Sequence, residues 1–194
     1  MREPNRIRDS IHAGLGRGRS LAEQPGIAGF GVAEVIGPDG VVKQTARFAN
    51  LITQVGDQYY GERAAGITSP PDQVTGMQLG EGTTAVAKTG AGAAIVTYIS
   101  GSDQANESGF PASTLETVDG DDKRQIRWRA FWDEGEATNN TINEVVLVNR
   151  TLDGSAATEA QTIARALFDS TIDKGASDTL RVTWDHHLFA APPA

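Results

Sequence analysis

Two segments of this chain alternate between apolar and polar residues at every second position, and this pattern restricts them to β-strands. The segments are Arg124–Trp132 and Thr179–Phe189. Side chains two residues apart share one face of a strand, whereas a helix needs apolar spacings of three and four. One face of these strands carries Trp128, Trp132 and Trp184. Each tryptophan can bury a large apolar area, so we predict that all three belong to the core.

A hairpin and one helix are predicted ahead of these strands. Phe30–Ile36 and Val41–Phe48 flank the sequence Gly-Pro-Asp-Gly, which is typical of a tight β-turn. The Asn50 side chain can accept a backbone hydrogen bond, so we predict that Asn50 is the N-cap of a helix ending near Gly61 or Gly66. Three apolar residues at a spacing of four would pack this helix on the sheet: Leu51, Val55 and Tyr59.

Short apolar runs separated by loops and Asp-Gly turns predict further strands. The runs are Met77–Leu79, Ala94–Ile99, Val145–Val148 and Ile163–Phe168. Many short strands suit an antiparallel arrangement. We therefore predict a mainly β protein, an antiparallel β-sandwich of jelly-roll or immunoglobulin-like type, with one short helix and an extended N-terminal arm.

Composition limits the domain organisation. The chain has 194 residues and 22 glycines, enough length for one core and many turns. Residues 1–26 are polar and glycine-rich, which predicts an extended arm, and residues 27–194 are predicted to form a single domain. The chain has no cysteine, which excludes disulfides and thiolate chemistry. No apolar stretch is long enough for a membrane helix and the N-terminus lacks the apolar segment of a secretory signal, so we expect a soluble protein made in the cytoplasm.

Charge is distributed unevenly along the chain. The net charge is -8, yet the first 19 residues carry +3, which leaves -11 on the rest. An acidic body repels phosphates, so nucleic acid is not an expected partner of the body. The arm could contact DNA, but we favour docking on an acidic neighbouring subunit. The predicted docking residues are its five arginines: Arg2, Arg6, Arg8, Arg17 and Arg19.

No catalytic, cofactor or metal site is predicted. The segment Gly82–Thr89 approaches a phosphate-binding loop, but Ala87 stands where glycine is needed and no helix is expected after it. His186 and His187 are neighbours on a predicted strand, so they point to opposite faces and cannot easily bind one metal. We interpret both as structural histidines. No nucleophile, base and acid form a recognisable catalytic set.

Two other patterns have a structural and a functional interpretation. Acidic residues cluster at 119–122 and 133–136, which suits solvated turns better than a calcium loop, because the EF-hand spacing is absent. A pair of carboxylates could also hydrolyse a glycoside, although nothing in the sequence selects a pair. The three tryptophans could form a sugar-stacking platform, but their shared inward face favours core packing.

Five blocks of sequence, in order, resemble a family of small virion proteins of tailed bacteriophages. They are FANLITQVG at 48–56, LGEGTT at 79–84, EATNNTINEVVLVN at 136–149, ARALFDSTIDKG at 164–175 and TLRVTWDHHLF at 179–189. Such proteins are capsid-decorating, minor capsid, tail or fibre-attachment components. The resemblance therefore implies a virion location, with other virion proteins (major capsid or tail proteins) and copies of the same chain as partners.

The predicted function is a non-enzymatic structural component of a phage particle, with a peripheral capsid role favoured. Small size, an acidic body and the absence of fibrous repeats support that choice over a tail or fibre-attachment role. A receptor- or carbohydrate-binding module at a tail tip is the alternative from another class, and it would need exposed tryptophans beside polar groups. We expect a homo-oligomer without cofactors and without a membrane.

Overall fold

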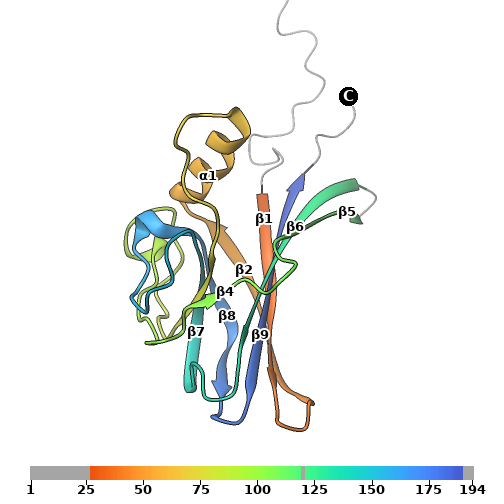
Figure 1. Ribbon diagram of the computed structural model, residues 1–194, viewed down its shortest axis with the longest axis vertical. Coiled ribbons are helices and arrows are strands. Elements are labelled where there is room, and N and C mark those ends of the chain that lie inside the picture. Colours follow the sequence, from red (N-terminus) through yellow and green to blue (C-terminus); the bar gives the residue numbers. More distant parts are fainter. Residues whose placement is uncertain (1–26, 119–120, 190–194) are drawn as a thin grey trace, which may run out of the picture.

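The computed structural model describes residues 27–118 and 121–189, which form nine β-strands, one α-helix and two short 3-10 helices (Figure 1). The strands are β1 Ile27–Ile36, β2 Val42–Ile52, β3 Gly76–Gly80, β4 Gln104–Ala105, β5 Ala112–Val118, β6 Asp121–Trp132, β7 Asn139–Val148, β8 Thr162–Lys174 and β9 Thr179–Phe189. The helices are α1 Gln54–Ala65, η2 Gly90–Ala93 and η3 Glu159–Gln161.

All nine strands belong to one antiparallel sheet with the order β4-β3-β7-β8-β2-β1-β9-β6-β5. The sheet curls, and residues 106–107 link its two sides: the Asn106 amide donates to the Thr75 carbonyl and the Glu107 amide to the Arg129 carbonyl. The predicted mainly β, antiparallel class is confirmed, and so is the first hairpin, β1 to β2. Its turn contains Gly40, whose φ of +78° favours glycine.

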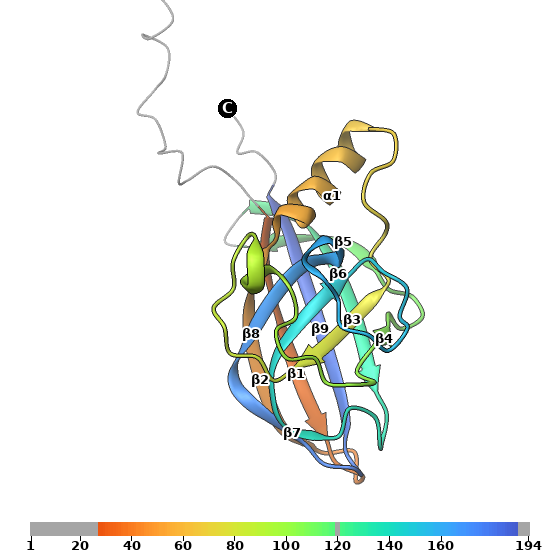
Figure 2. The ribbon, with the colours of Figure 1, turned by 90° about the vertical axis from the view of Figure 1, so that its left-hand side faces the viewer.

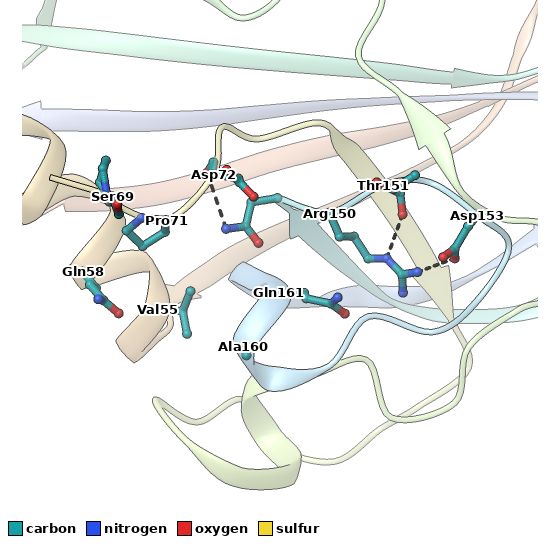
Figure 3. Close-up of a pocket in the computed structure, with 12 residues that line it drawn as sticks. Val55, Gln58, Ser69, Pro71, Asp72, Arg150, Thr151, Asp153, Ala160 and Gln161 are labelled. Atoms are coloured by element: carbon teal, nitrogen blue, oxygen red, sulfur yellow. Dashed lines mark hydrogen bonds and ion pairs between the residues drawn. The ribbon is translucent and has the colours of Figure 1, made fainter.

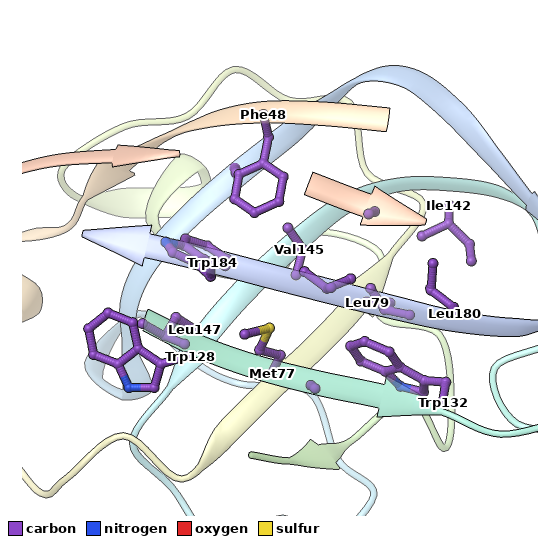
Figure 4. Close-up of a cluster of buried hydrophobic side chains, with 14 of the residues drawn as sticks. Phe48, Met77, Leu79, Trp128, Trp132, Ile142, Val145, Leu147, Leu180 and Trp184 are labelled. Carbon is purple, nitrogen blue, oxygen red and sulfur yellow. The ribbon is translucent and has the colours of Figure 1, made fainter. Parts of the chain in front are cut away.

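The concave side of the sheet is filled by large apolar side chains (Figure 4). Trp128 is 2% exposed, and Trp132 and Trp184 are fully buried. Phe48 packs edge-on against Trp184, with ring centroids 4.9 Å apart. Met77 of β3 belongs to the same cluster although it comes from the other side of the curled sheet. The prediction that all three tryptophans lie in the core is therefore confirmed.

The helix exists, but its predicted start was wrong. Asn50 lies in β2, paired with Gly29 and Ala166, because β2 continues to Ile52 between two partner strands. The N-cap is Thr53, whose hydroxyl accepts from the Gly56 amide at 3.0 Å. Gly66, one of the two predicted ends, is the C-cap, in a left-handed conformation. The ladder to β8 overrides the capping preference of Asn50.

The residues predicted to pack α1 on the sheet divide between two elements. Val55 and Tyr59 are partly buried against the core, as predicted. Leu51 belongs to β2, opposite Arg165 of β8. The helix therefore packs through its first two turns, where Gly56 lies so close to the Ile163 carbonyl that a Cβ atom would come within 2.1 Å of its oxygen.

The predicted strand Ala94–Ile99 is also wrong. This segment belongs to a long connection between β3 and β4, which Figure 2 shows crossing in front of the β7 and β8 region. Its only ladder contact among the described residues is a bridge from Tyr98 to Gly80. The amides of Val96 and Thr97 instead donate to the Glu144 carboxylate at 2.9 to 3.2 Å. Around that bridge the Glu81 amide donates to the Thr97 carbonyl and the Ile99 amide donates to the Leu79 carbonyl, so the segment has one short backbone contact with β3 and no full ladder.

Other predicted elements have clear outcomes. Met77–Leu79, Val145–Val148 and Ile163–Phe168 lie within β3, β7 and β8, and Val145–Val148 is fully buried. The arm at 1–26, with Arg2, Arg6, Arg8, Arg17 and Arg19, lies outside the described residues. No helix in the described part of the chain is long and apolar enough to cross a membrane.

Candidate partner-binding groove

An open groove of about 640 Å³ lies beside α1 and is the candidate binding surface (Figure 3). One wall is α1 and the loop that follows it, and the opposite wall is the connection from β7 to η3. Val55, Gln58 and Pro71 line the first wall, and Thr151 and Asp153 line the second. Polar side chains predominate, so the groove suits a hydrogen-bonding partner better than an apolar one.

The loop after α1 is held in place by its backbone and by one arginine. Ser69 has a φ of 62°, unusual for a residue other than glycine, and the two prolines that follow restrict the chain. The Arg63 guanidinium donates to the Pro71 carbonyl at 2.6 Å and stacks over the Tyr59 ring at 5.0 Å. Helix and loop therefore form one wall.

Arg150 is the cation of the opposite wall, but its donors are already in use. Its Nε donates to the Thr151 carbonyl, and its Nη1 donates to the Ser155 and Ala156 carbonyls. Its Nη2 bonds the Asp153 carboxylate and the Ser155 hydroxyl. A guanidinium has five N–H donors, so little remains for an anionic ligand. Arg150 shapes the loop rather than binding a partner.

The other polar residues of the groove include Asn149 and two aspartates. Asn149 is 8% exposed, and its Nδ2 donates to the Asp72 carbonyl at 3.4 Å. Its Oδ1 is buried and has no hydrogen-bond partner among the described residues. A buried acceptor without a partner is destabilising, and this oxygen lies beneath the surface of the groove, out of direct reach of a binding partner.

The carboxylates of Asp72 and Asp153 line the same groove. The Ser155 hydroxyl and amide keep the pKa of Asp153 below its usual range, so this group is ionised at neutral pH. Asp153 is paired with Arg150, so Asp72 is the carboxylate of the groove that has no arginine partner among the described residues. The matching ligand is a cationic or N–H-rich segment.

The buried pair Glu144 and Arg165 supports the loops beside the groove. Both side chains are fully buried, and Arg165 Nε donates to Glu144 Oε2 at 2.8 Å. Arg165 Nη2 lies 2.7 Å from the same oxygen, in ion-pair contact but at an angle outside a hydrogen bond. Arg165 Nη1 donates to the carbonyls of Thr84 and Gly92. The segment Gly82–Thr89, which approaches a phosphate-binding loop in sequence, is therefore a structural loop fixed by this ion pair.

His186 is a buried structural histidine. Its ring lies between Tyr60 and Trp184: Trp184 Nε1 donates to His186 Nε2 at 2.9 Å, and Tyr60 Oη lies 2.6 Å from His186 Nδ1. Because Nε2 accepts, the proton resides on Nδ1 and is donated to Tyr60. Burial lowers the pKa of His186 to about 3 and raises the pKa of Tyr60. Both groups are neutral at physiological pH.

His187 points to the other face, as predicted, where it contacts Phe30 and lies 3.6 Å from Glu116. The acidic turn at 133–136 is closed by Glu136, which accepts from the Asp133 amide at 2.8 Å. In the part of the chain that the structure describes, no three His, Asp or Glu side chains come together as a metal site would require. Asp119 and the side chain of Asp121 lie outside that part.

The sequence reasoning missed Glu144, Arg165 and Asn149. A signal existed for the first two, because each is a charged residue within an otherwise apolar strand, and a buried charge needs an opposite charge. Nothing in the sequence distinguishes Asn149, since its unpaired oxygen results from how three loops meet. No family model, curated protein or solved structure matches this chain.

Proposed function

We propose that this protein is a non-enzymatic structural component of a tailed-phage virion, acting as a peripheral capsid protein of decoration or minor capsid type. The main support is where the blocks that resemble phage virion proteins lie in the fold. They occupy the end of β2 with the start of α1, the end of β3, and most of β7, β8 and β9. Of these strands, β3, β7, β8 and β2 are consecutive in the sheet.

Those blocks are also linked by buried contacts. The first block pairs with the fourth in the ladder of β2 with β8, where Asn50 lies opposite Ala166 and Ile52 opposite Ala164. Glu144 of the third block pairs with Arg165 of the fourth and accepts from the Gly82 amide of the second. The resemblance thus falls on one packed unit rather than on scattered segments, which favours a shared fold over chance similarity.

We infer that the curled sheet serves as a sandwich, in which β3, β7 and β8 face β6, β9 and β1 across the tryptophan core. The cluster that includes Met77 and Leu79 with Trp128 and Trp132 supports this arrangement. The mechanism would be assembly, with many modest contacts made strong by repetition on the particle.

The groove beside α1 gives the arginine-rich arm a matching surface. Asp72 lines this groove without an arginine partner among the described residues, and guanidinium groups are donors only. We propose that the arm of a neighbouring copy, through Arg2, Arg6, Arg8, Arg17 or Arg19, docks in such an acidic groove. A tail or fibre-attachment role would use the same contacts at fewer copies. The receptor-binding alternative has lost its main argument, because all three tryptophans are buried.

Location and copy number on purified particles test the proposal. Quantitative mass spectrometry with electron microscopy of labelled particles should find tens to hundreds of copies on the shell. A ring of about six or twelve at a vertex or tail would assign the tail role instead. Absence from particles would overturn the virion role altogether.

Deletion of residues 1–26 tests the arm separately. The truncated protein should keep its melting temperature but be incorporated into particles at a reduced level, and binding of an arm peptide to it should weaken as salt rises. The matched variant Asp72→Asn removes an exposed carboxylate of the groove and should weaken peptide binding without lowering stability. Normal incorporation of the truncated protein would contradict arm docking.

A further inference from the structure

The strand β5 forms one edge of the sheet, and it lacks the features that normally protect an edge. Its seven residues, ASTLETV, have a neighbouring strand on one side only within the described residues. Natural edge strands are kept short or carry lysine, proline or bulges that prevent pairing with another chain. The opposite edge follows this rule, since β4 has only two residues. In β5 the single charge is Glu116, and Leu115 at its centre is 59% exposed.

The direction of the backbone groups in β5 follows from the neighbouring hydrogen bonds. The Arg129 carbonyl accepts from the Glu107 amide, so it points to the side of β6 on which β5 lies. Backbone groups alternate sides at every residue, so those of Arg127 point the same way and bond Ala112, its partner in β5. Two-residue alternation then directs the amides and carbonyls of Ser113, Leu115 and Thr117 to the free edge.

We propose that two copies of this chain pair through β5, antiparallel and about a twofold axis at Leu115. This register uses all seven residues of the strand, and it places Leu115 opposite Leu115 of the partner subunit as a hydrogen-bonded pair. Both leucines are exposed in the single chain and would become covered by each other.

The position of Glu116 favours a twofold axis at Leu115 over an axis one residue further along the strand, at Glu116. With the axis at Leu115, Glu116 lies opposite Thr114 of the partner subunit, so the only ionised residue of the strand does not meet itself. With the axis at Glu116, two carboxylates would face each other, which is unfavourable in a cross-strand pair. A twofold axis makes the same patch serve both copies.

A single strand pair buries less than the ~1,200 Å² of a standard stable interface, so the pairing should depend on protein concentration. Figure 1 shows β5 on the opposite side of the molecule from α1, so the groove beside the helix stays available to the arm. The pairing also stands independently of the virion role, because it rests on the edge of the sheet alone.

Cysteine pairs test the register, because the chain has no cysteine of its own. Residues 114 and 116 of two copies would be a non-hydrogen-bonded pair with Cα atoms ~4.5 Å apart, within the range that a disulfide spans. A mixture of Thr114→Cys and Glu116→Cys proteins should therefore form disulfide-linked dimers faster than either variant alone. In each single variant the two thiols would be offset diagonally by ~7 Å.

Leu115→Lys is the disrupting variant, since it brings two ammonium groups together on the axis. It should abolish the cross-linking and halve the mass measured by light scattering at high protein concentration, with an unchanged melting temperature. The matched control Ile67→Lys changes an exposed apolar residue in the loop after α1 and should leave both results unchanged. Equal cross-linking in the mixture and the single variants, or a monomer at every concentration, would overturn the proposal.

Discussion

Two of the buried polar clusters in the described residues are built on opposite principles. Glu144 and Arg165 form an ion pair surrounded by backbone partners, with amides from three residues bonded to the carboxylate. The cluster around His186 is neutral and packed among aromatic rings. A buried charge needs many compensating partners, whereas a neutral ring tolerates fewer.

Each cluster also has unpaired atoms. The Trp128 Nε1 donor and the Asn50 Oδ1 acceptor, both beside His186, and Arg165 Nη2 have no hydrogen-bond partner among the described residues. The aromatic cluster combines ring packing with the hydrogen bonds of Trp184 and Tyr60 to His186, whereas the charged cluster depends on one ion pair and its backbone partners. Variants in the two clusters should therefore respond differently.

Glu144→Leu should have the largest effect. It leaves Arg165 charged, buried and without its partner, which should cost ~3 to 5 kcal/mol in the free energy of unfolding measured with urea. The double variant Glu144→Leu with Arg165→Met removes both charges and should be less destabilised than the sum of the two single variants. Additive costs would mean that the two side chains do not act as a pair.

The tryptophans separate packing from hydrogen bonding. Trp128→Ala and Trp184→Ala should each cost ~3 to 5 kcal/mol through the cavity that they leave. Trp184→Phe also removes the donor to His186 Nε2, so it should cost ~1 kcal/mol more than Trp128→Phe, whose indole N–H has no acceptor within 27–118 and 121–189. Equal costs for the two phenylalanine variants, by thermal or urea unfolding, would refute this distinction.

The pH dependence of stability should report the neutral His186. Its pKa is about 3 in the folded protein and ~6.5 in the unfolded chain, so the unfolded chain binds more protons between these values. Stability is then complete above pH ~6.5 and falls as the pH decreases, by at most ~1.4 kcal/mol per pH unit. His186→Phe should flatten the curve between pH 6.5 and 5, where most carboxylates remain ionised.

The helix cap gives the smallest effect. Thr53→Ala removes the hydroxyl that accepts from the Gly56 amide and should destabilise by ~1 kcal/mol. Asn50→Ser is the comparison, because Asn50 lies in β2 and caps nothing. A loss of helical circular dichroism in the Asn50 variant, with none in the Thr53 variant, would contradict the assigned cap.

The sequence predicts the strands better than the connections. Arg124–Trp132 and Thr179–Phe189 were found because two-residue periodicity is a local property of a half-buried strand. The helix start was missed because Thr53 acts as a cap only once β2 has paired with β8 through Ile52. Ala94–Ile99 looked like a strand because its residues are apolar, but apolarity does not reveal that Glu144, about 50 residues later, supplies the acceptor for their amides.

The candidate groove was beyond the reach of sequence reasoning. Its character depends on which donors Arg150 has already used and on one oxygen of Asn149 that remains unpaired. Both facts depend on the meeting of α1, the loop at 69–72 and the loop before η3. The arm arginines, in contrast, are visible in the sequence as a block of charge opposite to that of the body.

The position of β9 has a consequence for the timing of folding. It follows every other strand along the chain, yet it lies inside the sheet between β1 and β6. During synthesis, β1 can pair with β2 early, but the ladder that joins this hairpin to β6 needs β9, because β9 is the strand between β1 and β6. The tryptophan core therefore stays incomplete until β9 brings in Trp184, so a nascent chain that has not released β9 would expose part of its apolar core.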